Sequence, residues 1–328
     1  MKKNLIETSL KNFPKQFSFK PEIQNQKNLA SFENVLVVGM GGSALSADIL
    51  KCGRPDLNLT AHKSYDLPSP TYHLKPKTLI VASSYSGNTE ETVSSFEKAR
   101  KLKANLAAIT TGGKLLALAK KYKTPHIKLP DTNIQPRVSL GFSLISLLKI
   151  IGQAEELKVL STLAKKLNPS LAEKTGRGLA ERLWDKVPVI YASASNLAVA
   201  YNWKIKLNET GKIPSFCNVF PELNHNEMTS FDVIKTTKVL SQKFHFLFLK
   251  DKSDPAKIQK RMLITEKLYK TRELFTESIE IKGENVWHKI FQNLLVADWT
   301  AVNLSRYYGT EATEVPMVEE FKKLIRQN

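Results

Sequence analysis

Short apolar runs that end in a glycine- or serine-rich turn, with a helical pattern beyond it, constrain the fold of this chain most strongly. Residues 35–38 are such a run, and it stops at Gly39 before an alanine-rich helical pattern over residues 44–50. Further apolar runs follow at residues 78–82 and 106–110. Short buried strands that alternate with helices are typical of a parallel, doubly wound sheet, so the sequence predicts an α/β fold.

A second half of the same kind begins after a polar passage at residues 165–174. Residues 187–192 form its first strand candidate, and a long helical pattern covers residues 286–307. With 328 residues, the chain is long enough for two medium domains. We therefore expect two doubly wound halves, each a mainly parallel sheet flanked by helices, and we divide them into residues 1–152 and 153–328.

Two turns at strand ends carry groups suited to a phosphate. The first, GMGGS at residues 39–43, lets backbone amides approach an anion at a helix N-terminus. It matches neither the GxGxxG of dinucleotide-binding proteins nor the GK[ST] of a P-loop. The second, SYSGNT at residues 84–89, adds three aliphatic hydroxyls at the start of a helix. The alternative is a structural role, with the hydroxyls capping the helix. We favour phosphate binding, and the predicted ligands are Gly41, Gly42, Ser43, Ser84, Ser86 and Thr89.

Composition narrows the functional classes. The chain carries a formal net charge of +18 from 49 Lys and Arg against 31 Asp and Glu. These basic residues are spread along the chain without a basic tail, which disfavours nucleic-acid binding and favours a solvated basic surface. No segment reaches the roughly 18–20 apolar residues of a membrane span. Cys52 and Cys217 are too few for a disulfide framework or a metal knuckle, so we expect a reducing compartment, the cytoplasm.

Both turns resemble those of a known family. The stretch SYSGNTEET is similar to the phosphate loop of sugar isomerase (SIS) domains, and GMGGSALSAD resembles the loop after their first strand. Within that superfamily, residues 135–137, 208–212 and 221–227 together resemble the bifunctional phosphoglucose/phosphomannose isomerases. The resemblance implies two SIS-type domains and an intramolecular oxidoreductase. Such an enzyme interconverts glucose 6-phosphate and fructose 6-phosphate, and it also acts on mannose 6-phosphate.

Aldose–ketose isomerisation moves a proton between C1 and C2 through an enediolate, and it therefore needs a base, a charge stabiliser and a ring opener. By the resemblance, Glu209 is the base, Arg137 stabilises the enediolate and His225 exchanges a proton with the ring oxygen or the C1 hydroxyl. The family ends in a helix that carries a catalytic lysine. The apolar spacing of the last helical pattern assigns it to Lys322, although Lys323 is adjacent. Without the flanking motifs, the glutamate, the arginine and the lysine would be interpreted as ordinary surface side chains and the histidine as a structural one.

Two alternatives stay open beside this interpretation. One is a non-catalytic SIS module that senses a sugar phosphate and regulates a partner, and the other is an SIS isomerase of an amino-sugar or heptose phosphate. Thr210-Gly211, and MTSF after Glu227, depart from the family and bear on substrate preference. Scattered histidines give no metal set, so we expect no metal and no cofactor. By the resemblance, the chain is expected to form a homodimer with a shared active site, into which His225 of the other subunit reaches.

Overall fold

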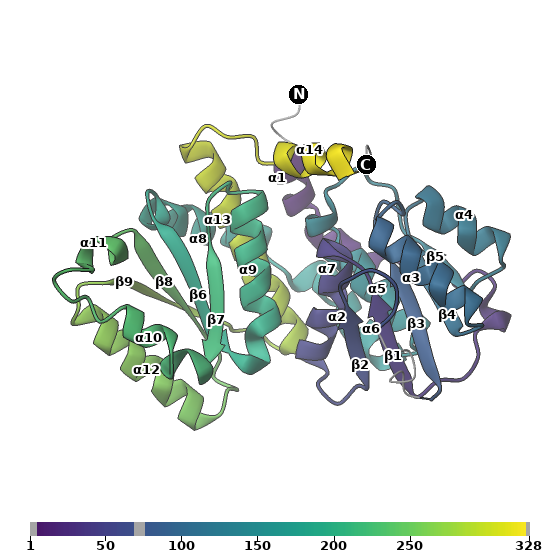
Figure 1. Cartoon of the computed structure of the whole chain (residues 1–328), viewed down its shortest axis with the longest axis horizontal. Coiled ribbons are helices and arrows are strands. Elements are labelled where there is room, and N and C mark those ends of the chain that lie inside the picture. The colour runs from purple at the N-terminus through teal and green to yellow at the C-terminus, as the bar shows by residue number, and fades with distance from the viewer. Residues whose placement is uncertain (1–4, 69–75, 326–328) are drawn as a thin grey trace. The chain divides into compact units, whose positions relative to one another are not determined.

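The computed structural model describes residues 5–68 and 76–325. Its contacts divide the chain into two compact units. The first unit is Asn12–Leu167, and the second combines Met1–Lys11 with Asn168–Asn328. Each unit contains one parallel sheet with helices packed against it, which confirms the predicted α/β fold (Figure 1).

The first unit is built on a five-stranded parallel sheet with the order β2-β1-β3-β4-β5. Because β2 and β3 pair with opposite edges of β1, the carboxyl ends of β1 and β3 meet at the switch point where open α/β sheets bind ligands. The strands are β1 Asn34–Val38, β2 Leu59–His62, β3 Thr78–Ser83, β4 Asn105–Thr110 and β5 His126–Lys128. The helical elements described here are η2 Phe13–Ser18, η3 Gln26–Asn28, α2 Gly41–Gly53, α3 Glu90–Lys101, α4 Gly113–Lys121, η5 Pro136–Val138, α5 Leu140–Ile150, α6 Ala154–Ser161 and α7 Leu163–Lys166.

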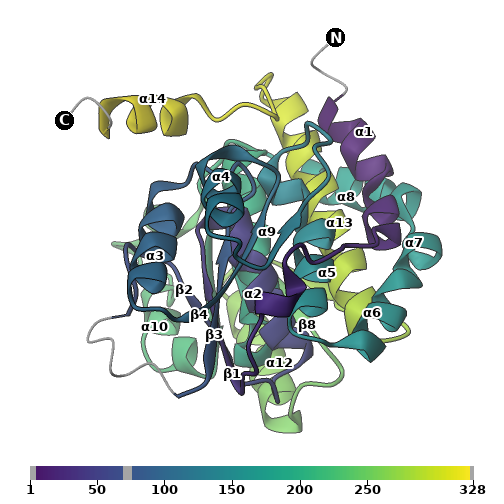
Figure 2. The same ribbon diagram turned by 90° about the vertical axis from the view of Figure 1, so that its right-hand side faces the viewer.

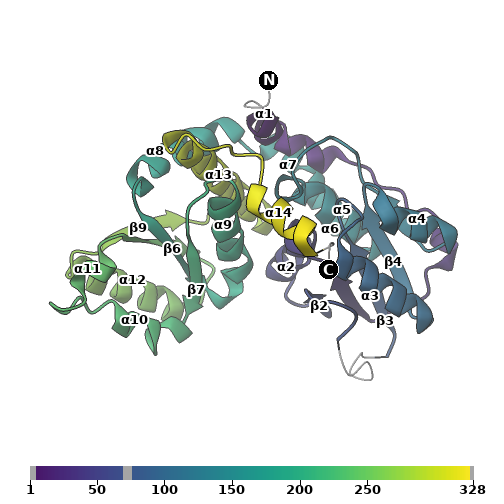
Figure 3. The same ribbon diagram turned by 45° about the horizontal axis from the view of Figure 1, so that its top comes forward.

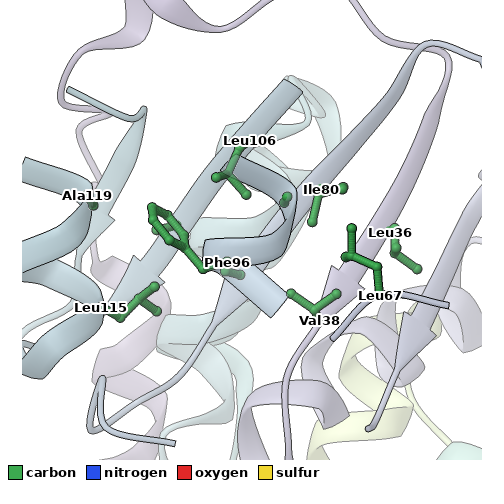
Figure 4. Packing of buried hydrophobic residues seen from close by; sticks show 11 residues of the cluster. Leu36, Val38, Leu67, Ile80, Phe96, Leu106, Leu115 and Ala119 are labelled. Carbon is green, nitrogen blue, oxygen red and sulfur yellow. The ribbon is translucent and has the colours of Figure 1, made fainter. Parts of the chain in front are cut away.

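Both faces of this sheet are covered. One face packs against α3 and α4, with the fully buried ring of Phe96 between the helix and the strands (Figure 4). Alternate strand residues point to this face, because side chains of a strand alternate between its two sides. They are Leu36, Val38, Ile80, Ala82, Leu106 and Ala108. The intervening strand residues are buried too, where α2 contacts β1 and α5 contacts β4. Burial on both faces explains why the strands are continuous apolar runs.

The second unit has a four-stranded parallel sheet with the order β7-β6-β8-β9, again with its first strand in the middle. The strands are β6 Val187–Ser193, β7 Phe216–Phe220, β8 Phe244–Lys250 and β9 Phe275–Glu280. The helical elements described here are α1 Leu5–Lys11, α8 Pro169–Leu183, η6 Ala194–Asn196, α9 Leu197–Glu209, η7 Glu222–Asn224, α10 Glu227–Ser230, α11 Lys238–Ser241, α12 Ala256–Lys270, α13 Val286–Tyr307 and α14 Pro316–Ile325.

An aromatic cluster fills one side of this second sheet. Its largest members are the fully buried rings of Tyr191, Phe220, Phe246, Phe248 and Tyr269, which meet edge-on or tilted at centroid separations of 4.6–6.3 Å. Elsewhere in the unit, α9 contacts β6, β7 and the long, buried helix α13 (Figure 3). The N-terminal helix α1 packs on α8 and α13 (Figure 2).

The apolar runs at residues 35–38, 78–82, 106–110 and 187–192 coincide with β1, β3, β4 and β6. The sequence places the domain boundary between residues 152 and 153, whereas the contact division lies after Leu167, because α6 and α7 contact α5 and η2 of the first unit. Within the described residues, no helix combines the length and apolar character needed to cross a bilayer.

Candidate active site

The first predicted phosphate loop lies at the carboxyl end of β1, where α2 begins. Gly41 has a φ of 49°, a left-handed conformation that glycine adopts without strain. Gly42 is required for a different reason, since a Cβ at this position would lie 2.8 Å from the carbonyl oxygen of Pro136. The loop therefore packs directly against the segment that carries Arg137, and α2 also contacts η5.

The second predicted loop follows β3 and is joined to the first by a hydrogen bond. The backbone amide of Tyr85 donates to Ser43 Oγ at 2.9 Å, which leaves the hydroxyl proton of Ser43 available to an acceptor. Ser84 Oγ accepts from the amide of Gly87 at 3.1 Å and lies 2.9 Å from Thr89 Oγ1. When Ser84 donates in that pair, the hydroxyl proton of the more accessible Thr89 is free to bind an anion.

The six predicted phosphate ligands thus differ in accessibility. Gly41 and Ser86 are exposed, Gly42 and Thr89 are half-buried, and Ser43 and Ser84 are buried. Ser86 Oγ accepts from the backbone amide of Asn88 at 3.3 Å. Ser84 is engaged within its own loop, whereas the more accessible groups lie near the N-terminal ends of α2 and α3.

A third loop, not identified from the sequence, supports the second one from behind. Thr111 Oγ1 donates to the carbonyl oxygen of Tyr85 at 2.7 Å, and the backbone amide of Thr111 donates to the same oxygen at 3.0 Å. Gly87, with φ of 72°, packs so closely that an added Cβ would lie 1.9 Å from the carbonyl oxygen of Gly112. The signal available in the sequence was a further turn-forming stretch, TTGG at residues 110–113, directly after an apolar run.

This close contact predicts that substitution of Gly87 by alanine lowers stability more than substitution of a glycine with free space around it. Gly152 is a matched control, because it has φ of 74° but nothing within 4 Å of an added Cβ. Gly152→Ala should lower the free energy of unfolding by about 1–2 kcal/mol, through the strain of a left-handed backbone alone. We expect Gly87→Ala to lower the free energy of unfolding by about 1–3 kcal/mol more than Gly152→Ala does, because its Cβ overpacks the loop. It should also bind sugar phosphate more weakly. Urea unfolding and a sugar-phosphate titration of both variants check this, and equal behaviour of the two would contradict it.

Arg137 lies in the first unit, in the 3-10 helix η5, and is almost completely buried at 5% exposure. Its Nη1 donates to Gln135 Oε1 at 3.4 Å. A guanidinium keeps its charge in such a setting and offers donors in a fixed plane. Because η5 packs against Gly42, the backbone of Arg137 lies beside the first predicted phosphate loop.

Glu209 is the last residue of α9 in the second unit, and its side chain is half-buried. Two buried polar contacts hold α9 against α13. Trp203 Nε1 donates to Asn293 Oδ1 at 2.7 Å, and Lys206 Nζ forms an ion pair with Asp298 Oδ1 at 2.7 Å. Removing one partner of so deeply buried an ion pair is costly, so the pair fixes the position of the helix that carries Glu209.

Lys212 joins the end of α9 to the segment before α14. Its Nζ donates to the backbone carbonyls of Glu209 and Glu314, an interaction that suits the unpaired carbonyls at a helix C-terminus. In α14, Lys322 Nζ donates to Glu319 Oε1 at 2.7 Å in an exposed ion pair. The apolar side chains of α14 are also exposed.

His225 directly follows η7, in the turn beyond the carboxyl end of β7. Its side chain is exposed, and its backbone amide donates to the carbonyl oxygen of Glu222 at 2.9 Å. An exposed imidazole on a turn is available for proton exchange with a ligand, provided that the turn itself holds one conformation.

The predicted residues therefore form two groups. The phosphate ligands and Arg137 belong to the first unit, where adjoining elements bring them together, and Glu209, His225 and Lys322 belong to the second. Among residues 5–68 and 76–325, no cluster of three or more His, Cys, Asp or Glu is arranged to hold a metal ion.

Comparison with known proteins extends over nearly the whole chain. Residues 172–325 match the family model described as the bacterial phospho-glucose isomerase C-terminal SIS domain. The bifunctional phosphoglucose/phosphomannose isomerase of Caldicellulosiruptor bescii is 32% identical over 97% of this chain and 98% of its own length. The enzyme of the same name from Thermoplasma volcanium is 32% identical over 90% and 93%. The crystal structure of tagatose-6-phosphate ketose/aldose isomerase from Escherichia coli shares the fold, with a TM-score of 0.69 at 16% identity over 94% of each chain.

Proposed function

This chain belongs to the bifunctional phosphoglucose/phosphomannose isomerase family, and on that basis we propose that it is an aldose–ketose isomerase. It interconverts glucose 6-phosphate and mannose 6-phosphate with fructose 6-phosphate. The observation that carries this proposal is the 32% identity to an enzyme of that name over 97% of the chain. Relatives named as isomerases along nearly the full length do not favour a non-catalytic sensor.

The proposed binding step uses the first unit. The dianionic phosphate of the substrate accepts hydrogen bonds from the backbone amides at Gly41 and Gly42 and from the hydroxyls of Ser43, Ser86 and Thr89. Ser84 takes part by orienting Thr89 across their 2.9 Å contact. The N-terminal ends of α2 and α3 add their positive dipole ends to the same anion. The hydrogen bond between Tyr85 and Ser43 supports this assignment, because it keeps the two loops together.

The proposed chemistry begins with ring opening. His225 donates a proton to the ring oxygen as the bond between C1 and that oxygen breaks, and it takes up the proton that the C1 hydroxyl releases, which gives the open-chain aldose. Glu209 then removes the proton from C2, and the electron pair forms the C1–C2 double bond of an enediolate whose negative oxygen is stabilised by Arg137. Glu209 then returns the proton to C1 while the proton of the C2 hydroxyl passes to the C1 oxyanion, and fructose 6-phosphate results. Lys322 is assigned to the same site as a further cationic donor.

One intermediate explains both aldose substrates. C2 is planar in the enediolate, so protonation from one face gives glucose 6-phosphate and protonation from the other gives mannose 6-phosphate. The base and the charge stabiliser are side chains of the chain itself, so the proposed mechanism uses no metal and no cofactor. We place the activity in the cytoplasm, in keeping with a composition of only two cysteines.

An NMR assay of the purified protein with fructose 6-phosphate tests the proposal. We expect signals of glucose 6-phosphate and of mannose 6-phosphate to grow with time. Binding of the ketose phosphate without turnover would instead support a sensor. Turnover of an amino-sugar or heptose phosphate alone would support another isomerase of the same superfamily.

We further propose that the active enzyme is a homodimer in which His225 serves the site of the other subunit. Glu209→Gln and His225→Ala proteins, mixed equally under subunit exchange, should then recover about one quarter of wild-type activity. Half of the dimers are mixed, and each of these contains one site with both wild-type residues. Activity of the mixture is compared with that of each variant alone, and no recovery after verified exchange would argue for sites completed within one chain.

A further inference from the structure

The turn that carries His225 is anchored on its N-terminal side. Leu223 is fully buried in the aromatic cluster of the second unit. Asn224 Nδ2 donates to Thr265 Oγ1 of α12 at 2.9 Å, and Arg261 Nη1 donates to Asn224 Oδ1 at 3.3 Å. His225 itself is exposed, so its backbone position depends on what holds the residues on each side of it.

On the C-terminal side, the anchor is the carboxylate of Glu227. Tyr191 Oη, from the central strand β6, donates to Glu227 Oε1 at 2.6 Å. Asn218 Nδ2, from the neighbouring strand β7, donates to Glu227 Oε2. Asn226 Oδ1 accepts from the amide of Glu227 and so fixes the start of α10. Both carboxylate oxygens are thus held by two paired strands of the sheet, the interior strand β6 and the edge strand β7.

The donor in this contact keeps its proton. Burial raises the pKa of the Tyr191 hydroxyl far above its ordinary value, and Tyr269, whose Oη lies 3.3 Å away, raises it further. Burial likewise raises the pKa of Tyr269 to about 12. The raised pKa favours the neutral phenol of Tyr191, the form that donates to Glu227.

We propose that Glu227 is a positioning residue, which fixes the turn so that His225 meets the ring oxygen of the substrate. This inference rests on the proposed isomerase function and adds a residue to it. Glu227 acts through His225 rather than on the substrate, because both of its oxygens are already occupied by donors from the sheet. Glu222 lies in the same turn, but its side chain is exposed and accepts a hydrogen bond from Asn226 Nδ2 of the turn itself at 2.8 Å.

Glu227→Gln is the primary test. A glutamine removes the negative charge, and it can keep both contacts only if Tyr191 Oη changes from donor to acceptor, so neutral hydrogen bonds replace the charge-assisted ones and the turn is held more weakly. The readout is the rate at which the α and β anomers of glucose 6-phosphate interconvert, measured by exchange NMR, because this reaction needs ring opening but no proton transfer at carbon. We expect the catalysed rate to fall about tenfold to hundredfold, as when a catalytic group is displaced. Affinity for sugar phosphate stays at the wild-type value.

Four further variants are measured alongside Glu227→Gln. Glu209→Gln keeps anomer exchange while it loses isomerisation, His225→Ala loses anomer exchange, and Glu222→Gln behaves as wild type. Tyr191→Phe keeps the aromatic packing but removes the donor, so it reproduces the effect of Glu227→Gln and decides the question if that variant does not fold.

The inference is overturned if His225→Ala loses anomer exchange while folded Glu227→Gln or Tyr191→Phe keeps it. It is overturned as well if the two variants lose sugar-phosphate affinity in proportion to rate, because that is the result of general destabilisation. A wild-type protein that catalyses neither anomer exchange nor isomerisation would contradict the proposed function itself, which distinguishes the two failures.

Discussion

Glu209→Gln lowers the turnover number for glucose 6-phosphate by about 10²–10⁴-fold, the usual loss when a general base is removed. Gln preserves the size of the side chain and most of its hydrogen bonding but cannot accept a proton from carbon. Phosphate binding and ring opening are assigned to other residues, so the dissociation constant for sugar phosphate should change little. Steady-state kinetics and direct titration of the variant give the two quantities.

Glu181→Gln is the control, since Glu181 is an exposed carboxylate of α8 in the same unit. It should keep wild-type turnover. Wild-type turnover by Glu209→Gln would show that another group removes the proton. A large loss of affinity with unchanged turnover would instead show that Glu209 holds the substrate in its ground state.

Arg137→Met lowers turnover by about 10²–10³-fold, the loss found when a donor to a developing oxyanion is deleted. Methionine fills much of the buried volume without the charge or the planar donors. Arg137→Lys restores the charge but not the geometry, so it should recover only part of the rate. Turnover and thermal unfolding are measured together, because the side chain is only 5% exposed and its loss also affects packing.

The comparison of turnover with KM decides the role of Arg137. A fall in turnover with little change in KM is expected of a group that binds the enediolate. A raised KM at wild-type turnover would make Arg137 a phosphate ligand instead, since the backbone of this residue lies beside the first predicted phosphate loop.

Much of the fold can be predicted from the sequence because its central strands are buried on both faces. Such strands must be continuously apolar, and the tight turn after β1 requires glycine at Gly41 for its backbone conformation and at Gly42 for its packing. Edge strands carry a weaker signal. β2 and β5 are short, and much of β2 and β7 is only partly buried, so the sequence alone does not distinguish these three strands from loops.

Residues that hold the candidate site in position are harder to predict from the sequence than the proposed reactive residues. The contact of Gly87 with Gly112 depends on how the ends of β3 and β4 align, and no local pattern encodes that alignment. Similarly, Tyr191 and Glu227 are brought together by the pairing of β6 with β7. The domain division differs from the expected one because a helical pattern does not say which unit a helix packs against. The contacts of α6 and α7 with α5 and η2 place both helices in the first unit.

The account as a whole depends on proton transfer at C2, and solvent deuterium reports it directly. In D2O, the wild-type protein should convert fructose 6-phosphate to glucose 6-phosphate and mannose 6-phosphate that carry deuterium at C2, because the proton held by Glu209 exchanges with solvent during the lifetime of the enediolate. NMR resolves the C2 position of each product. Deuterium-free products that form at the wild-type rate even in Glu209→Gln, or the absence of any aldose product, would contradict the enediolate mechanism proposed for this chain.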